Sequence, residues 1–257
     1  METDLIEAID ILGVRVHKVT MAAALRRCTD FLASGGQHQI VTVNPEFIME
    51  AQKNAGFRLV LNRAALAVPD GIGLVAAARL AGLTLETRVA GVDLIDGLLH
   101  SAAKHGSRVF LFGAADGVAA RAADILRRRI PGLRIIAAEN ERDERGRLRQ
   151  DAEIIARIAA AHPDILLVAF GAPRQDLWIA ENLRRLPSVK IAIGAGGTLD
   201  YFAEVLPRAP RLLRAIGLEW LWRLALQPSR WQRIVTATIR FPWAVLTTPQ
   251  SVHPHEL

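Results

Sequence analysis

The stretch that decides the fold is Ala65-Leu-Ala-Val-Pro-Asp-Gly-Ile-Gly73. Its first four residues are apolar and predict a short buried strand. The strand ends at Pro69, because proline has no N–H to donate to a sheet. Asp70 follows at once, and the apolar run 74–80 predicts a helix. An acid between a strand and a helix lies at the carboxyl edge of the sheet, where open α/β folds bind ligands. Asp70 is therefore a candidate site residue, with capping of the helix as the alternative.

The rest of the chain repeats this unit of strand and helix. Apolar strands are expected near residues 40, 66, 110, 135, 167 and 191, each followed by a helical run. This alternation predicts an α/β fold with a doubly wound, mostly parallel, six-stranded Rossmann-like sheet. Residues 9–19, which turn near Gly13, predict a small N-terminal β-hairpin. We expect this core to span residues 1–206.

Composition narrows the class of protein. The chain has 257 residues, of which 51% are hydrophobic, yet it contains no uncharged apolar run of the roughly 18 residues that a spanning helix needs. Its N-terminus lacks a signal-peptide pattern, and its one cysteine, Cys28, excludes an internal disulfide framework. Both features favour a cytoplasmic protein. The seven histidines show no metal-ligand spacing, so we expect no structural metal.

The C-terminal segment 207–257 differs from the rest. Residues 207–243 contain seven arginines, four of the five tryptophans and one acid, Glu219. Arginine and tryptophan on amphipathic helices are typical of an element that lies on a membrane surface. We therefore expect a basic, helical, membrane-associating appendage, with a helix packed on the sheet as the alternative.

Polar residues and glycines follow several of the predicted strands. Thr42 and Asn44 point to the same side at the end of the first strand, although an Asn-Pro pair also serves as a helix cap. Arg88 lies in a glycine-containing loop and is suited to a phosphate. The helix start after Gly171 favours an anion, and the glycines of 194–200 let a ligand approach the backbone. Together these features predict a nucleotide-type ligand.

Two other classes of protein stay open on these residues. A dinucleotide-dependent oxidoreductase would use the loop 113–117, but that loop lacks the full G-x-G-x-x-G fingerprint and gives Asp70 no task. A nucleic-acid-binding α/β protein would use the arginine cluster on phosphates and bases. Binding of UDP against NAD, and of liposomes against DNA, would separate the three.

A series of motifs then follows in order: Thr42-Val-Asn-Pro-Glu46, Pro69-Asp-Gly-Ile-Gly73, Arg88-Val-Ala-Gly-Val-Asp93, Gly171-Ala-Pro-Arg-Gln175, Gly194-Ala-Gly-Gly-Thr-Leu-Asp200, Arg208-Ala-Pro, Gly217-Leu-Glu-Trp-Leu-Trp-Arg-Leu and Pro228-Ser-Arg-Trp231. Together they resemble the bacterial WecG/TagA/CpsF glycosyltransferase family, over about residues 9 to 235.

The resemblance implies an inverting, metal-independent transferase without a cofactor. Such an enzyme moves a sugar from a UDP-sugar to a polyprenyl-diphosphate-linked sugar at the inner face of the membrane. The sugar would be of the N-acetylmannosamine type, its uronic acid or another hexose, for teichoic acid or another surface polysaccharide. The sequence has no Asp-x-Asp pair to hold a divalent ion on the donor diphosphate. We expect the anionic membrane surface as a partner and expect no nucleic acid. Assembly into a homo-oligomer is left open.

Matching the motifs residue by residue implies the roles in the site. Asp70 matches the proposed general base, and Arg88 matches a pocket arginine suited to a diphosphate. Thr42, Asn44 and Gln175 match polar residues of the pocket, and Asp200 matches a contact to the nucleotide. The appendage arginines that match a membrane and acceptor-diphosphate role are Arg208, Arg211, Arg214, Arg223, Arg230 and Arg233. One departure is the loop that begins at residue 138, which is more charged than the family pattern.

Overall fold

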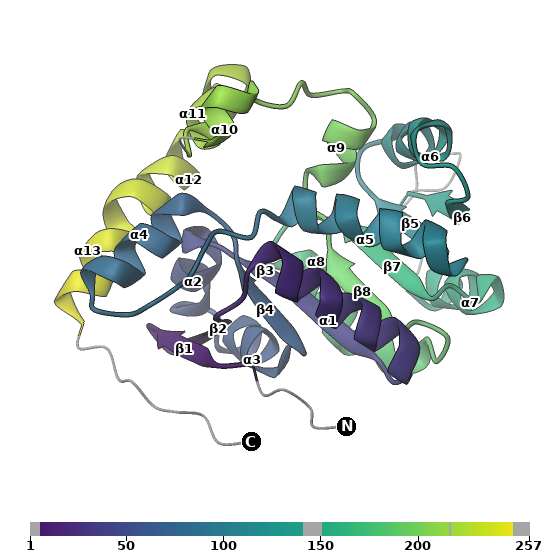
Figure 1. The fold of residues 1–257 in the computed structure, drawn as a ribbon, viewed down its shortest axis with the longest axis horizontal. Helices are drawn as coiled ribbons and strands as arrows, with labels where there is room; N and C mark the ends of the chain where they lie inside the picture. Colours follow the sequence, from purple (N-terminus) through teal and green to yellow (C-terminus); the bar gives the residue numbers. More distant parts are fainter. Residues whose placement is uncertain (1–5, 141–150, 216, 249–257) are drawn as a thin grey trace.

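The computed structural model describes residues 6–140, 151–215 and 217–248 (Figure 1). Its centre is a six-stranded sheet in the order β4-β3-β8-β7-β5-β6, and every pairing in it is parallel. This confirms the predicted α/β fold. The strands are β3 (His38–Val43), β4 (Leu66–Pro69), β5 (Arg108–Gly113), β6 (Arg134–Glu139), β7 (Ile165–Ala169) and β8 (Ile191–Gly194).

Helices cover both faces of the sheet, and side chains of successive strand residues enter different cores. In β4, Leu66 and Val68 pack in one apolar cluster, whereas Ala67 between them packs in another. The first face carries α1 (Met21–Ser34), α5 (Gly91–His105), α6 (Val118–Arg129) and α9 (Thr198–Phe202). The second carries α2 (Pro45–Ala51), α3 (Ala55–Arg63), α4 (Ile72–Leu80), α7 (Asp151–Ala161) and α8 (Arg174–Asn182).

The predicted N-terminal hairpin is present as β1 (Ala8–Ile11) and β2 (Val14–His17), which pair antiparallel. It lies beside the edge strand β4, where His17 Nδ1 accepts a hydrogen bond of 2.9 Å from the Ala67 N–H. Burial, together with the nearby charge of Arg15, lowers the pKa of His17 to about 4. The neutral ring can therefore keep accepting this bond, and the hairpin covers an edge that would otherwise expose unpaired backbone groups.

One element differs from the sequence-based expectation. The one helical run expected after the first strand is divided in two: α2 ends at Ala51 and a separate helix, α3, follows. The break occurs because Asn54 caps α3, its side chain accepting the Phe57 N–H at 2.9 Å. Phe57 and Leu61, one turn apart, are buried, so α3 is held by packing rather than by helix propensity.

The appendage is helical from α10 (Arg211–Ala215) and α11 (Glu219–Leu226) to α12 (Trp231–Val235) and α13 (Phe241–Thr247). A π-helical turn, Thr236–Arg240, joins α12 to α13. It ends two residues before Pro242, whose missing N–H removes one α-helical hydrogen bond, and the wider turn accommodates that loss. Phe241 and Val245 are buried in the same cluster as α2, α3 and α4, so the end of the appendage packs on the core. Within the part of the chain described, no helix has the length and apolar character needed to cross a membrane.

Candidate active site

A cavity of about 360 Å³ opens at the carboxyl ends of β3, β4 and β8. The helices that follow the neighbouring strands β3 and β8 leave to opposite faces of the sheet, which makes this the switch point where α/β folds bind ligands. The N-termini of α4 and α5 form part of its wall, and α11 and α12 of the appendage close it from the other side. The core and the appendage therefore build one site together.

Asp70 lies at the end of β4, in the wall of this cavity. Its backbone N–H donates to the Val43 carbonyl at 2.7 Å, which extends the pairing with β3 by one residue. Its side chain does not cap α4: the N-cap is Gly71, at φ 104°, and no side chain makes a capping bond there. The capping alternative is therefore wrong, and glycine meets a backbone conformation that a side chain would strain.

The neighbours of Asp70 set its ionisation. Burial raises the pKa of this carboxyl to about 6, although Arg88 and a hydrogen bond from the Gly91 N–H both lower it. The charges of Glu219 and Asp93 raise it further. Its side chain remains 27% exposed, so it can reach a ligand. A carboxyl with a pKa near 6 is ionised at neutral pH yet basic enough to accept a proton, as general-base catalysis requires.

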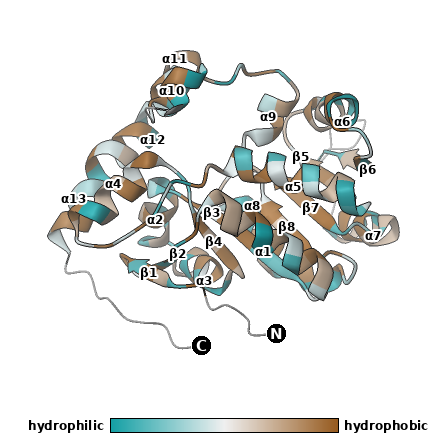
Figure 2. Ribbon diagram, viewed as in Figure 1, coloured by the Kyte–Doolittle hydropathy of each residue, from teal (hydrophilic) through white to brown (hydrophobic). Residues whose placement is uncertain are grey.

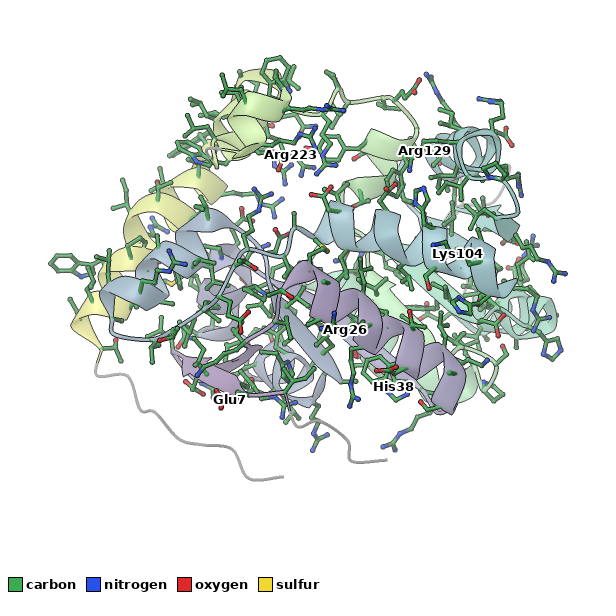
Figure 3. The ribbon with its side chains drawn as sticks, in the orientation of Figure 1. Glu7, Arg26, His38, Lys104, Arg129 and Arg223 are labelled. Atoms are coloured by element: carbon green, nitrogen blue, oxygen red, sulfur yellow. The ribbon has the colours of Figure 1, made fainter. Side chains whose placement is uncertain are left out.

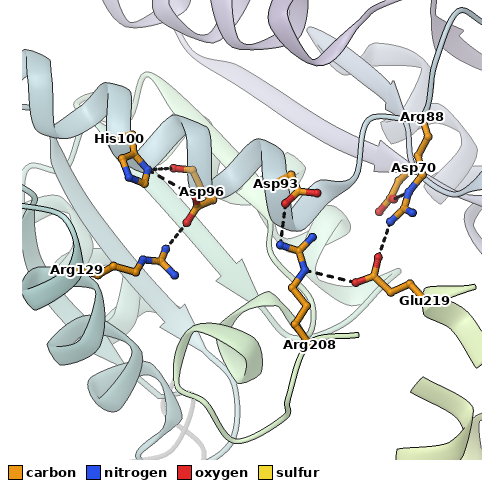
Figure 4. Close-up of polar contacts among 8 residues, drawn as sticks. All are labelled: Asp70, Arg88, Asp93, Asp96, His100, Arg129, Arg208 and Glu219. Carbon is orange, nitrogen blue, oxygen red and sulfur yellow. Dashed lines mark hydrogen bonds and ion pairs between the residues drawn. The ribbon is translucent and has the colours of Figure 1, made fainter. Parts of the chain in front are cut away.

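A chain of ion pairs connects Asp70 to the appendage (Figure 4). Arg88 Nε lies 3.8 Å from Asp70 Oδ1, and Arg88 Nη2 donates to Glu219 Oε2 at 2.7 Å. Glu219 Oε1 lies 3.5 Å from Arg208 Nε, and Arg208 Nη1 lies 2.7 Å from Asp93 Oδ1. Arg88 thus lies in the cavity wall as predicted, but its guanidinium is already engaged by carboxylates on two sides.

A second group of arginines enters the cavity from the appendage. Arg223 lies over the Tyr201 ring, 5.2 Å from its centroid, and reaches from α11 toward the core (Figure 3). The pKa of Arg230 is lowered to about 10 by burial and by the like charges of Arg223 and Arg233. Arg233 pairs with Glu46. A guanidinium group whose pKa is lowered by crowded like charges is part of a site that an anion would stabilise.

The predicted polar residues of the pocket all line it, but with different tasks. Asn44 caps α2, its side-chain oxygen accepting the Phe47 N–H at 3.0 Å. Thr42 is buried against Gly91 at the start of α5. Gln175 Oε1 accepts the N–H groups of Gly171 and Gly196 at 3.1 and 3.0 Å, so it joins two glycine-rich loops across the cavity floor.

The structure does not place every predicted residue in the wall. Arg223, Arg230 and Arg233 line the cavity, whereas Arg208, Arg211 and Arg214 do not. Asp200 lies behind the wall, where burial raises its pKa against the opposing charges of Arg223 and Arg230. The lining residues that sequence analysis missed include Glu46, Thr198, Tyr201 and Glu219. Glu46, Thr198 and Glu219 lie within the quoted motifs, and Glu219 was also the one acid among seven arginines.

Two loops singled out in the sequence do not contribute described residues to the cavity wall. The loop 113–117, which an oxidoreductase would use, follows β5 and is not part of the cavity wall. The charged loop that departs from the family pattern begins at residue 138, and its residues 141–150 lie outside the described residues. Within the described ranges, no group of three or more His, Cys, Asp or Glu side chains is placed to hold a metal ion.

Residues 9–252 match the sequence model of the glycosyl transferase WecG/TagA/CpsF family. The chain belongs to this family. Three relatives are each named N-acetylglucosaminyldiphosphoundecaprenol N-acetyl-beta-D-mannosaminyltransferase. The protein from Bacillus spizizenii is 36% identical, covering 84% of this chain and 82% of its own. Those from Bacillus subtilis and Staphylococcus aureus are 35% and 31% identical, covering 77% and 88% of this chain and 75% and 86% of their own.

Membership assigns the chain to the glycosyltransferases and confirms the resemblance seen in the motifs. It also gives the cavity a chemical context. A glycosyltransferase needs a base for the acceptor hydroxyl and positive charge for its leaving group. The carboxyl of Asp70 and the guanidinium groups of Arg88, Arg223, Arg230 and Arg233 all line this one cavity.

Proposed function

We propose that this glycosyltransferase moves a sugar from a UDP-sugar to a polyprenyl-diphosphate-linked sugar, with inversion at the anomeric carbon and without a metal ion. The observation that carries the proposal is the convergence of Asp70 with Arg88, Arg223 and Arg230 in one cavity. The relatives' name supports N-acetylglucosamine on undecaprenyl diphosphate as the acceptor and an N-acetylmannosamine-type sugar as the group transferred.

In the proposed reaction, an acceptor hydroxyl attacks the anomeric carbon of the donor sugar. The new bond forms as the bond from that carbon to the diphosphate oxygen breaks, and UDP leaves with the electron pair. Asp70 takes the hydroxyl proton, for which its pKa of about 6 is suited. Arg223 and Arg230 stabilise the charge that develops on the diphosphate, a task that a divalent ion performs in other transferases.

The acceptor lipid requires the site to lie near a membrane, and we propose that the appendage docks on the anionic inner face. Figure 2 shows hydrophobic and hydrophilic residues interleaved along α10 to α13. Several large apolar side chains of these helices are exposed: Leu212, Trp220, Leu221, Trp231, Ile239, Trp243 and Leu246. Tryptophan beside arginine suits the boundary between headgroups and acyl chains, and each arginine near such a surface adds about 1 kcal/mol.

The test is a transfer assay with the full-length protein, a short-chain prenyl-diphosphate-linked N-acetylglucosamine and a panel of UDP-sugars. Mass spectrometry should detect one added sugar for a preferred donor, and EDTA should leave the rate unchanged. Loss of activity in EDTA, restored by Mg²⁺, would overturn the metal-free mechanism. Absence of product with every UDP-sugar would overturn the proposed donor.

A further inference from the structure

The one acid within 207–243 lies inside the site rather than on the surface. Glu219 is the first residue of α11, and its side chain is only 14% exposed. It contacts two guanidinium groups, Arg88 at 2.7 Å and Arg208 at 3.5 Å (Figure 4). A carboxylate held between two arginines makes contacts of the kind that a bound phosphate makes, because both anions accept N–H groups from guanidinium.

Two nitrogens of the Arg88 guanidinium already face carboxylates. Its Nη2 donates to Glu219, and its buried Nε lies 3.8 Å from Asp70 without a hydrogen-bond partner. Its remaining surroundings include the negative charge of Asp93, which is engaged by Arg208. A diphosphate that accepts a hydrogen bond from Arg88 Nη2 would therefore compete with the Glu219 carboxylate for that N–H.

We propose that Glu219 holds Arg88 in the free enzyme in place of a substrate diphosphate, and that the diphosphate displaces it on binding. The inference rests on the proposed function, because it takes Arg88 as a diphosphate ligand. Glu219 is thus a positioning residue, which keeps Arg88 beside Asp70 until substrate arrives. Arg223 follows it by four residues on α11, so the two side chains share a helix face. Release of Glu219 and engagement of Arg223 would accompany one movement of that helix.

The central experiment compares Glu219→Gln with wild type by calorimetry of UDP, of uridine and of the short-chain prenyl-diphosphate-linked sugar. The variant keeps the side-chain shape and removes the competing charge. We expect Kd to fall by at least about fivefold for a diphosphate ligand, because the displaced pair is mostly shielded from water. Uridine should show no change. A gain for UDP identifies the donor, and a gain for the prenyl diphosphate identifies the acceptor, as the ligand of Arg88.

The matched control is Glu86→Gln, which removes the same charge from an exposed side chain two residues from Arg88. It should leave all three Kd values unchanged. In the Arg88→Ala background, Glu219→Gln should increase diphosphate affinity by less than half as much as it does in wild type. The reason is that the guanidinium for which Glu219 and the diphosphate compete is absent. If Glu219→Gln has a lower melting temperature than the control, Glu219→Asp provides a second variant. It keeps the charge but shortens the side chain, and it should also lower the Kd for the diphosphate ligand.

The pH profile supplies a readout that a purely structural role would not move. Asp70 is faced by Arg88, Asp93, Glu219 and the Gly91 N–H, and the charge of Glu219 raises its pKa. Glu219→Gln should therefore shift the acid limb of kcat/KM to lower pH. Unchanged diphosphate affinity in Glu219→Gln, with UDP binding still weakened by Arg88→Ala, would overturn the inference alone. Failure of wild type to bind UDP or to transfer sugar would instead overturn the proposed function.

Discussion

At the scale of single residues, the proposed base is best tested by a change that keeps its shape. Asp70→Asn cannot take up the acceptor proton, so turnover should fall by roughly 10²–10⁴-fold. UDP affinity should change little, since the arginines remain. Asp93→Asn is the matched control: it neutralises a nearby carboxylate that pairs with Arg208, and its loss of turnover should be far smaller. Product formation under single-turnover conditions measures both, and a near wild-type rate for Asp70→Asn would contradict its role.

The same substitution should stabilise the fold. The folded-state pKa of Asp70, about 6, lies above its ordinary value of 3.8. Folding therefore favours the protonated form of Asp70. The resulting contribution to the free energy of unfolding is lost as pH rises through 6. At pH 7.5 the buried charge is a net cost, so Asp70→Asn should raise the free energy of unfolding by on the order of 1–3 kcal/mol. Urea unfolding at pH 4 and pH 7.5 measures this effect. The variant should have a higher free energy of unfolding than wild type only at pH 7.5.

Arg88 lowers the pKa of the Asp70 carboxyl, whereas burial raises it. In wild type, the acid limb of kcat/KM should have an apparent pKa near 6, where Asp70 becomes protonated. Because the Arg88 charge lowers that pKa, Arg88→Ala should move the limb to higher pH. UDP binding should also weaken by roughly tenfold, the value of one charge-assisted hydrogen bond. An unmoved limb would show that another group controls the profile.

At the scale of elements, the turn between β8 and α9 sets how closely the appendage approaches. A Cβ at Gly197 would lie 2.1 Å from Arg223 Nη2, while the backbone there has an ordinary negative φ of −82°. Gly197→Ala should therefore fold normally but displace the Arg223 guanidinium. We expect UDP affinity to fall by roughly tenfold. Gly73→Ala is the control, because its Cβ would also enter the cavity wall but find ordinary contacts at 3.8 Å.

At the scale of the whole molecule, the final helices pack one face on the core and expose another, which we propose contacts a membrane. Phe241 is fully buried, whereas Trp231 and Trp243 are 57% and 70% exposed. Phe241→Ala should lower the free energy of unfolding by about 3–5 kcal/mol.

The double variant Trp231→Ser, Trp243→Ser should keep its melting temperature but bind anionic liposomes less, and high salt should weaken wild-type binding. Equal flotation of the double variant and wild type would contradict membrane docking.

Much of this arrangement could be predicted because its causes are local. Strand–helix alternation specified the parallel sheet, and the Pro69-Asp70-Gly71 sequence placed an acid at its carboxyl edge. The break before α3 was missed although its cause, the Asn54 cap, is also local. The polar run Gln52-Lys53-Asn54 at the break was the signal available in the sequence.

Other features could not be predicted, since they depend on which distant residues the fold brings together. Glu219 reaches Arg88 across 131 positions, and Gln175 reaches Gly196 across 21 positions. The burial of Phe241 likewise depends on where α2 and α4 lie, and a basic segment alone does not reveal that.

The sequence by itself therefore determined the fold class, the proposed base and the basic character of the appendage. Periodicity, turn residues and charge are properties of short segments. Only the tertiary structure decided that the appendage closes the cavity, that three of its six proposed arginines line it, and that Arg88 faces Glu219. Those contacts follow from the path of the whole chain, because an ion pair forms between any two opposite charges that packing brings within reach.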